Sequence, residues 1–365
     1  MKANVTIHDV ARAAGVSTKT VSRVTNGEDT VAAETVRRVQ AAIDTLGYRV
    51  NPLARSLRTG RDDAIAVVVT SIADPFFASV VDAVEEAARE AGWFLLVGTT
   101  GRSAGEERAV INGVLQRSVR GLVIVPAQLD YGAAALPLGT GGVPVVFVDR
   151  SPVNMAADVV TIDNGAIARH AAEHLIAHGH RRIGFVATSA EAGGARHYPV
   201  VARQLGYRAA LEAHALSFDP ALVIALERGS RDCQPMLCQL LELDDPPTAV
   251  LCGNELASLA VVGELRRSGR ADVAIVCVDD FPMADALEPA ITVARQDPVL
   301  MGHRAFGLLR ERIDGGKKRP RTVILPTTFI ERGSGELSPP AGARSKRKRV
   351  GPSPRPSPTN RSNHA

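Results

Sequence analysis

The sequence predicts an α/β protein in which three short N-terminal helices precede a two-lobed core of parallel sheets flanked by helices. Short β-branched runs alternate with helical stretches from Ala64 onward, and the alternation restarts after Asp163, which indicates two parallel α/β units. The chain has 365 residues, and 45% of them are hydrophobic. That length allows two or three domains, and that composition suits a globular protein with a large buried core.

The N-terminal part of the chain predicts three helices joined by short turns. Thr6 is the expected N-cap of the first helix, with Asp9 completing a variant of the capping box. After a glycine turn, Ser17 is the expected N-cap of a second helix, and a third helix is expected over about 33–46. This arrangement follows the helix-turn-helix plan. We therefore predict a helix-turn-helix domain over residues 1–50.

The segment "NPLARSLRTGR", residues 51–61, is predicted to be a linker. It begins with a cap and a proline, but it has too few apolar residues to bury a helical face. An isolated helix of this length is marginal in water, so we expect the segment to become helical only when a partner holds it.

The core is expected over residues 62–336, with a first lobe of about 62–161 and 293–324 and a second lobe of about 162–292 and 325–336. Its predicted strands lie at 64–71, 94–100, 121–127, 144–149, 181–187, 248–253 and 273–280. Helices are expected between them, at 77–91, 106–116, 166–177, 200–213 and 256–267. In open parallel sheets, ligands bind beyond the carboxyl ends of the strands. Polar residues that follow the predicted strands are therefore candidate ligand contacts.

Charge is distributed unevenly along the chain. Residues 1–61 carry ten Lys and Arg against five Asp and Glu, and residues 337–365 carry seven against none. The whole chain has a net charge of +4, so the residues between carry about −8. Basic ends on an acidic body favour a polyanionic partner. The segment from 337 on is rich in Pro, Ser and Arg and is predicted to be a disordered, solvated tail, with a weak contact to nucleic acid as the alternative.

Membrane, secreted and enzymatic classes are not favoured. The sequence has no apolar run long enough for a membrane span and no apolar signal region at its start, so we expect a cytoplasmic protein without a membrane partner. The four cysteines lack zinc or redox spacing and are expected to be reduced thiols. His174, His178 and His180 end an amphipathic stretch and are expected to be structural rather than metal ligands. Because no nucleophile or complete phosphate-loop motif is found, we predict no enzyme activity, no catalytic or metal site and no cofactor.

Two N-terminal stretches, "TIHDVARAAGVSTKTVSRVTNG" and "GYRVNPLARSLRTGR", precede three core motifs, "DPFFASVVDAVEEAAREAG", "VTIDNGAIARHAAEHLIAHGHRRIGF" and "VDDFPMADALEPAITVARQDPVLMG". Together they resemble the lactose/galactose repressor (LacI/GalR) family of bacterial transcription regulators over roughly residues 5–333. The resemblance implies a DNA-binding helix-turn-helix domain and a periplasmic-binding-protein-like core. It also implies a sequence-specific transcription regulator, expected to be a repressor, controlled by a small-molecule effector bound between the two lobes.

The resemblance assigns roles to the second helix, which lies in the major groove in this fold and shows its N-terminal residues to base edges. Because the valines of this helix face the domain core, Thr18, Lys19 and Arg23 are the expected base-reading residues. Phosphate contacts, which position the domain on double-stranded DNA, are expected from Thr6, Ser17, Thr20, Ser22 and Asn26.

The resemblance also assigns a role to the linker. Two such segments, one from each subunit of a homodimer, are expected to fold as hinge helices in the minor groove at the centre of a pseudo-palindromic operator. Leu57 is expected to wedge between base pairs, with Ala54 in the groove and Arg58 at its edge or backbone. Packing of Leu57 between domains is the alternative. The outer face of the helix over 77–91 and its counterpart in the second lobe are the expected dimer interface.

Effector contacts are expected where polar or aromatic residues follow the core strands. A carboxylate accepts hydrogen bonds from ligand hydroxyls, an aromatic face suits a sugar ring, and arginine can donate two parallel hydrogen bonds. By resemblance the contacts are Asp74, Phe76, Phe77, Asp149, Arg150, Arg203, Asn254, Asp279 and Gln296. Asp279 and Arg203 are the strongest candidates, and Glu255 stands where the family usually has aspartate. A sugar or related metabolite is the expected effector, and a sugar-binding protein without a role in DNA regulation is the alternative function.

Overall fold

The computed structural model of the chain describes residues 5–25, 28, 30–48, 63–101, 104–127, 142–188, 198–226, 234–316 and 318–340. The chain divides into two units, one of residues 1–161 and 298–323 and the other of residues 162–297 and 324–365. Within the described ranges, no helix has both the length and the apolar character that crossing a membrane requires.

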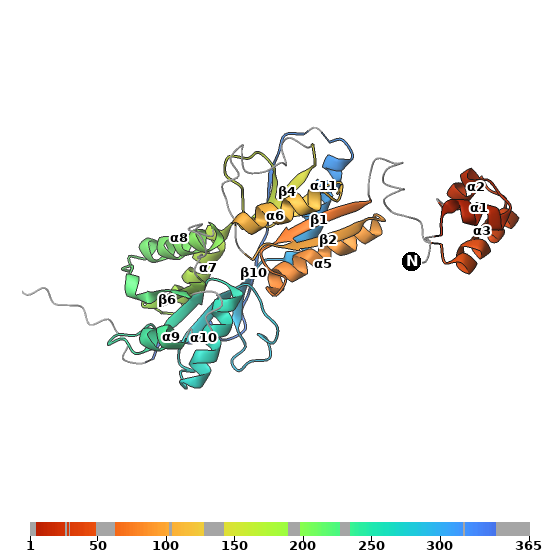
Figure 1. Cartoon of the computed structure of the whole chain (residues 1–365). Coiled ribbons are helices and arrows are strands. Elements are labelled where there is room, and N and C mark those ends of the chain that lie inside the picture. The colour runs from red at the N-terminus through yellow and green to blue at the C-terminus, as the bar shows by residue number, and fades with distance from the viewer. Residues whose placement is uncertain are drawn as a thin grey trace, which may run out of the picture. The chain divides into compact units, whose positions relative to one another are not determined.

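The three predicted N-terminal helices are present as α1 (Ile7–Ala14), α2 (Thr18–Thr25) and α3 (Ala33–Leu46), drawn in red at the start of the chain (Figure 1). Their shared core contains Val10, Val21 and Val39, none of which has exposed surface. The backbone N–H and the hydroxyl of Thr6 donate hydrogen bonds of 3.0 and 2.7 Å to one carboxylate oxygen of Asp9. These bonds fix the start of α1 at the position that the capping pattern predicts.

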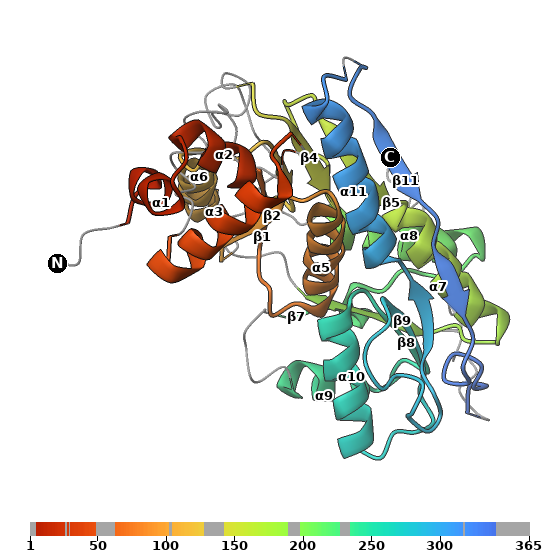
Figure 2. The ribbon, with the colours of Figure 1, turned by 90° about the vertical axis from the view of Figure 1, so that its right-hand side faces the viewer.

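The first unit contains a six-stranded sheet with the strand order β11-β5-β4-β3-β1-β2. Its strands are β1 (Ala64–Val69), β2 (Phe94–Thr99), β3 (Leu122–Ile124), β4 (Val145–Val148), β5 (Asp158–Ile162) and β11 (Thr322–Leu325). Helices α5 (Pro75–Glu90) and α11 (Pro298–Ile313) pack side by side (Figure 2). Helix α6 (Ala104–Leu115) packs against Ala66 and Val68 of β1. Because helices cover the sheet, β1 is apolar along its length rather than alternating.

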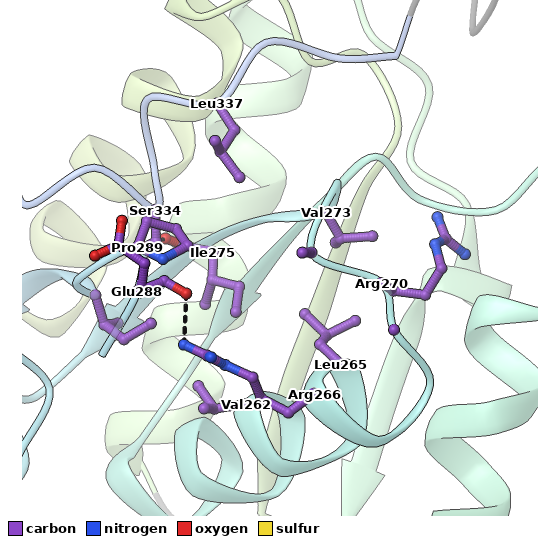
Figure 3. Close-up of a pocket in the computed structure, with 13 residues that line it drawn as sticks. Val262, Leu265, Arg266, Arg270, Val273, Ile275, Glu288, Pro289, Ser334 and Leu337 are labelled. Atoms are coloured by element: carbon purple, nitrogen blue, oxygen red, sulfur yellow. Dashed lines mark hydrogen bonds between the residues drawn. The ribbon is translucent and has the colours of Figure 1, made fainter. Parts of the chain in front are cut away.

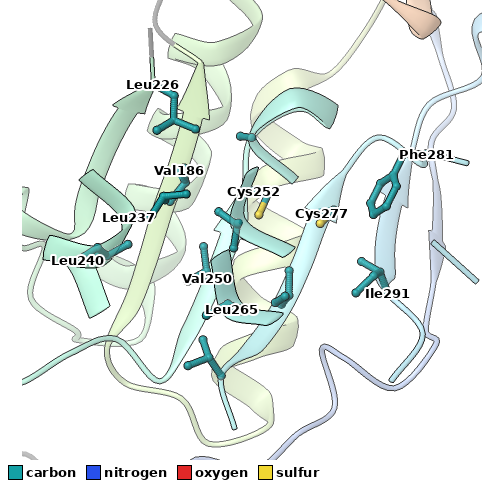
Figure 4. Close-up of a cluster of buried hydrophobic side chains, with 14 of the residues drawn as sticks. Val186, Leu226, Leu237, Leu240, Val250, Cys252, Leu265, Cys277, Phe281 and Ile291 are labelled. Atoms are coloured by element: carbon teal, nitrogen blue, oxygen red, sulfur yellow. The ribbon is translucent and has the colours of Figure 1, made fainter. Parts of the chain in front are cut away.

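The second unit repeats this plan with the strand order β12-β10-β9-β8-β6-β7. Its strands are β6 (Ile183–Thr188), β7 (Val223–Leu226), β8 (Ala249–Cys252), β9 (Ala274–Val278), β10 (Thr292–Arg295) and β12 (Thr328–Ile330). Its helices are α7 (Asn164–Ala177) packed on α8 (Tyr198–Ala213), and α9 (Gln234–Leu241) packed on α10 (Glu255–Arg267). Figure 4 shows the core to which α9 and α10 contribute, in which Cys252 and Cys277 occupy paired positions on β8 and β9. Both thiols are buried and free, which agrees with the prediction of reduced cysteines.

Several elements lie outside the sequence-based predictions. Strands β7 and β11 are at sheet edges and keep partly exposed side chains, so neither has the continuous apolar run that marks a buried strand. Helix α9 has only eight residues, which is too short for a clear helical period. Each of these elements covers or extends a sheet that the stronger patterns already predict.

The structure places two boundaries differently from the sequence patterns. The patterns return the chain to the first lobe at residue 293, but β10 pairs with β9 and belongs to the second sheet, so the first unit resumes at Pro298. The patterns also start the disordered tail at residue 337, whereas residues 337–340 belong to the described chain. Leu337 is held there by a hydrogen bond, which composition alone does not reveal. Residues 341–365 lie outside the described residues.

The predicted structural role of the three histidines is confirmed. His178 is the C-cap residue of α7, and its Nδ1 lies 2.9 Å from the His174 carbonyl oxygen. His180 has no exposed surface, and its ring nitrogens lie 2.9 Å from Thr248 Oγ1 and 2.8 Å from the Leu337 carbonyl oxygen. Burial lowers the pKa of His180. His174 Nε2 lies 2.6 Å from a carboxylate oxygen of Glu336. The rings of His174 and His180 therefore hold Glu336 and Leu337, near the end of the described chain, against the second unit.

Candidate functional sites

Helix α2 turns its cations away from the core of the N-terminal domain. Val21 is fully buried and Val24 is half-buried, whereas Lys19 and Arg23 are exposed. Thr18 is half-buried and has less surface to offer to a base edge. The expectation that the two cations lie on the outer face is confirmed, and their contacts with particular bases stay a prediction.

Three of the hydroxyls expected to bind phosphate make local hydrogen bonds. Ser17 Oγ accepts a bond of 3.1 Å from the backbone N–H of Thr20, which makes Ser17 the N-cap of α2, and the two hydroxyl oxygens are 2.9 Å apart. The Thr6 hydroxyl donates to Asp9, and the hydrogen bonds from Thr6 hold the pKa of Asp9 below its ordinary value. A phosphate oxygen must therefore compete with Asp9 for the Thr6 hydroxyl. Ser22 is half-buried, and the other residues predicted to contact DNA lie outside the described residues: Asn26, Ala54, Leu57 and Arg58.

In the first unit, Asp149 and Arg150 follow the end of β4. Asp149 has a left-handed backbone with φ of 69°, which aspartate tolerates better than most residues. Arg150 Nε donates to Asp149 Oδ2 at 3.1 Å, and Nη1 donates to the carbonyl oxygen of Pro126 at 2.8 Å. The Thr161 hydroxyl donates to the Asp149 carbonyl oxygen at 2.9 Å. The two charges are buried as a neighbouring pair, so each offsets the cost of burying the other.

The start of α5 holds the other predicted contacts of the first unit. Asp74 caps the helix by accepting a hydrogen bond of 3.3 Å from the backbone N–H of Phe76. The rings of Phe76 and Phe77 meet edge to face with centroids 5.3 Å apart. Phe77 is buried and Phe76 is half-buried, so Phe76 has more of its ring surface free for a ligand.

Sequence reasoning missed three polar residues near the same strand ends. The hydroxyls of Thr70 and Thr100, which follow β1 and β2, are buried and have no hydrogen-bond partner among the described residues. Glu107 of α6 is fully buried, and its carboxylate accepts a hydrogen bond of 2.5 Å from the backbone N–H of Ala127. Thr70 directly follows the apolar run of β1, which was an available signal, but threonine is also common inside strands.

In the second unit, a network forms around Arg203 of α8. Its Nε donates to Asn164 Oδ1 and its Nη1 to the Gly253 carbonyl oxygen, each at 2.8 Å, and Nη1 lies 3.3 Å from Asp279 Oδ2. Asp279 follows β9 with φ of 76°, and its Oδ1 accepts a bond of 2.7 Å from Gln296 Nε2. The structure therefore brings together Arg203, Asp279 and Gln296, which sequence analysis predicted from separate motifs.

Asn254 lies at the N-terminus of α10 in the same unit. Its Oδ1 accepts a hydrogen bond of 3.0 Å from the backbone N–H of Ala257, and its Nδ2 donates to Thr188 Oγ1 at 2.5 Å. Asn254 is thus a helix cap with its amide oriented by a neighbouring strand. Glu255 is buried in the first turn of α10, where a negative charge interacts favourably with the helix dipole.

Two buried polar atoms of the network have no partner among the described residues: Asn164 Nδ2 and Gln296 Oε1. A buried donor or acceptor without a partner costs about 1–3 kcal/mol. A ligand that supplies one hydrogen-bond acceptor and one donor removes both costs. Hydroxyl groups can do both, so the network suits a polyhydroxylated ligand. Asn164 was not predicted, although it follows β5 by the same strand-end rule.

A cavity of about 110 Å³ lies elsewhere in the second unit (Figure 3). Val262, Leu265 and Ile275 are among its apolar lining residues, and Arg266 Nη2 donates to the Glu288 carbonyl oxygen at its rim. It adjoins the beginning of β9, whereas Asp279 follows the end of that strand. The polar network around Arg203 is therefore a separate site.

A helix-turn-helix domain with an outward cationic helix, followed by two α/β units with buried polar groups at their strand ends, defines a DNA-binding protein with a ligand-binding core. The model for bacterial regulatory proteins of the lacI family matches residues 6–51, and that for a periplasmic binding protein-like domain matches residues 172–335. The transcriptional regulator CelR of Thermobifida fusca is 36% identical over 341 residues, covering 90% of this chain and 98% of that protein. The chain belongs to the lacI family of bacterial regulatory proteins.

Other relatives agree with this assignment. The transcriptional repressor PurR of Vibrio atlanticus is 30% identical, covering 90% of this chain and 97% of that protein. The solved CelR–cellobiose complex is 32% identical with a TM-score of 0.65, and the Lac repressor bound to ONPG in the repressed state is 27% identical with a TM-score of 0.79. Each comparison covers 91% of this chain and 100% of the solved one. The protein is therefore a DNA-binding transcriptional regulator and not an enzyme.

Proposed function

We propose that this protein is a cytoplasmic repressor that binds a pseudo-palindromic operator as a homodimer and responds to a sugar or related metabolite. The observation that carries the effector proposal is the buried network of Arg203, Asp279 and Gln296, with unpartnered polar atoms on Asn164 and Gln296. A polar ligand that hydrogen-bonds these atoms gains affinity, because they are already desolvated and oriented. The relative in complex with cellobiose supports a sugar as the class of ligand.

Residues at the strand ends of each unit are proposed as effector contacts. In the second unit these are Arg203, Asp279 and Gln296, with Asn254 at the margin. In the first unit they are Asp149, Arg150, Thr70 and Phe76, with Asp74 and Phe77 supporting the start of α5. Each buried arginine is already close to an aspartate. This charge balance favours an uncharged ligand over an anionic one.

Binding to DNA is proposed to follow the family arrangement. Lys19 and Arg23 contact base edges in the major groove, and Thr18 contributes through its methyl group or hydroxyl. Serine and threonine hydroxyls of α1 and α2 contact phosphates, which positions the domain without reading sequence. Leu57 wedges into the minor groove at the operator centre, flanked by Ala54 and Arg58.

The proposed dimer interface rests on exposed apolar side chains. On the first unit, Ile72, Phe94 and Val97 are large exposed hydrophobic residues, and Phe94 keeps 76% of its surface exposed. On the second unit, Leu256 and Leu259 are exposed on α10. Because the exposed residues of α5 are mostly charged, we favour the β2 edge and the segment before α5, which contains Ile72, over the outer face of α5 proposed from sequence.

Effector and DNA are proposed to be coupled through the core, so that binding of one changes the affinity for the other. Coupling free energies of this kind are about 1–3 kcal/mol and act reciprocally. An inducer weakens operator binding, and a corepressor strengthens it by the same linkage.

A mobility-shift titration tests the proposal. The purified full-length protein is titrated onto the DNA upstream of its own gene, with and without a panel of sugars, including cellobiose, and purines. A competitor-resistant shift that one compound moves supports both parts of the proposal. Binding no stronger than to unrelated DNA, followed by failure of selection from genomic fragments, contradicts sequence-specific regulation. Sedimentation of wild type and of Phe94→Glu tests the dimer separately.

A further inference from the structure

We propose that Glu28 is a positioning residue for Arg23 and thereby strengthens the preference of the protein for its own operator. Glu28 lies just beyond the end of α2, and its backbone N–H donates a hydrogen bond of 3.0 Å to the Arg23 carbonyl oxygen. Its carboxylate Oε2 lies 3.5 Å from Arg23 Nε, and both side chains are 45% exposed. The inference rests on the proposed base-reading role of Arg23.

The closest contact of the pair is on the Nε side of the guanidinium. Arginine has five N–H donors in a planar fork. Recognition of guanine needs two parallel donors directed at O6 and N7, which the Nη1 and Nη2 edge can supply. A carboxylate on the Nε side restricts rotation of this plane, so less side-chain entropy is lost when Arg23 meets a base.

The location of Glu28 is otherwise unfavourable for a negative charge. An acid at the C-terminal end of a helix interacts poorly with the helix dipole. An exposed acid on a DNA-binding domain also repels phosphates and lowers non-specific affinity. The pair with Arg23 offsets the first effect but leaves the repulsion of phosphates in place. Removing the charge should therefore have opposite consequences for the two kinds of binding: weaker discrimination between bases and stronger binding to unrelated DNA.

The test uses the full-length protein with Glu28→Gln, Arg23→Ala, the double variant, and Glu34→Gln as a matched control. Glu34 is an exposed acid in the first turn of α3, so its substitution makes the same charge change elsewhere in the domain. The best site is first selected from random duplexes with wild type. Affinity is then measured for that site, for its single-base-pair variants and for unrelated DNA, at several salt concentrations, after circular dichroism has shown that each variant is folded.

The expected result is that Glu28→Gln lowers the preference for guanine at the position read by Arg23 by about two- to fivefold, the range that an exposed ion pair supports, while affinity for unrelated DNA is equal or higher. Glu34→Gln should raise non-specific affinity similarly and leave every base preference unchanged. In the Arg23→Ala background, Glu28→Gln should have no further effect on base preference.

Different outcomes would exclude the base-reading role of Arg23 and the positioning role of Glu28. If Arg23→Ala keeps the wild-type base preferences, the base-reading role of Arg23 is wrong. If Arg23→Ala loses a preference that Glu28→Gln retains in full, Arg23 reads a base and the positioning role of Glu28 is wrong. Equal losses by Glu28→Gln on every site, selected and unrelated, would also overturn the positioning role.

Discussion

In each unit an aspartate follows a strand at the same place in the sheet, but the two aspartates have different partners. β4 and β9 occupy equivalent places in their sheets, and each is followed by an aspartate in the left-handed region. Asp149 pairs with the next residue, Arg150, which also donates to the Pro126 carbonyl oxygen. Asp279 contacts Arg203 from α8 and Gln296 beyond β10. The same strand end therefore supports a local pair in one unit and a long-range network in the other.

The largest effect is expected from removing the centre of the network. Arg203→Ala leaves Asp279 as a buried carboxylate without its cation and removes the donor to Asn164. Breaking a buried ion pair in this way costs about 3–5 kcal/mol, and the effector response should be lost as well. Urea unfolding measures the first effect and effector titration the second. Arg208→Ala, on the exposed side of the same helix, is the control. A similar loss of stability and effector response in Arg208→Ala would show that the effect is not specific to Arg203.

A second substitution tests whether the two aspartates are equivalent for the effector. Asp279→Asn should weaken effector binding by at least about tenfold, because a charged acceptor becomes a neutral one. DNA binding without effector should stay intact. Asp149→Asn should have a smaller effect, since Arg150 retains its bond to Pro126. Calorimetric titration of both variants checks the order, and a normal response in Asp279→Asn removes Asp279 from the effector site.

Acid should affect the second unit through Asp280, which is adjacent to Asp279. Two hydrogen bonds from Arg332, of 2.8 and 2.7 Å, lower the pKa of Asp280 below its ordinary value of 3.8. The unfolded chain therefore takes up this proton first as pH falls. The stabilisation is fully present above the ordinary pKa and is lost as pH falls through the folded value. Asp280→Asn should be less stable than wild type at neutral pH, with the difference shrinking below pH about 4. A constant difference between the two unfolding curves across that range contradicts this assignment.

The smallest change in stability is expected at the unpartnered hydroxyl of the first unit. Thr70→Val removes a buried hydroxyl that has no described partner, so stability should change by no more than about 0.5 kcal/mol or rise. Effector affinity should fall about fivefold if the hydroxyl contacts the ligand. Thr161→Val is the matched control, because its hydroxyl donates to the Asp149 carbonyl oxygen and its loss should cost about 1 kcal/mol. Unchanged effector affinity in Thr70→Val excludes the contact.

The sequence predicted much of this arrangement where a pattern repeats or a rule is local. Helical periodicity located α1 to α3, and buried β-branched runs located β1, β6 and β9. The resemblance to a known family contributed Arg203, Asp279 and Gln296, and the structure then joined them. Asn164 and Thr100 were not predicted, because nothing in the local sequence distinguishes a hydroxyl or amide that keeps a partner from one that lacks it. The pair of Arg23 and Glu28 joins α2 to a residue beyond its end, and no local pattern in the sequence predicts that contact.

The chain passes back and forth between the two units of the core, and this order limits how early each unit can fold during synthesis. The chain leaves the first unit at residue 161, returns at 298 and leaves again at 323. The N-terminal helices hold their whole core by residue 48 and can fold early on the ribosome. The first sheet must wait for α11 to cover it and for β11 to pair along β5, and the second must wait for β12. Neither half of the core can therefore mature alone, and a ribosome that stalls before residue 298 releases a DNA-binding domain tied to two unfinished sheets.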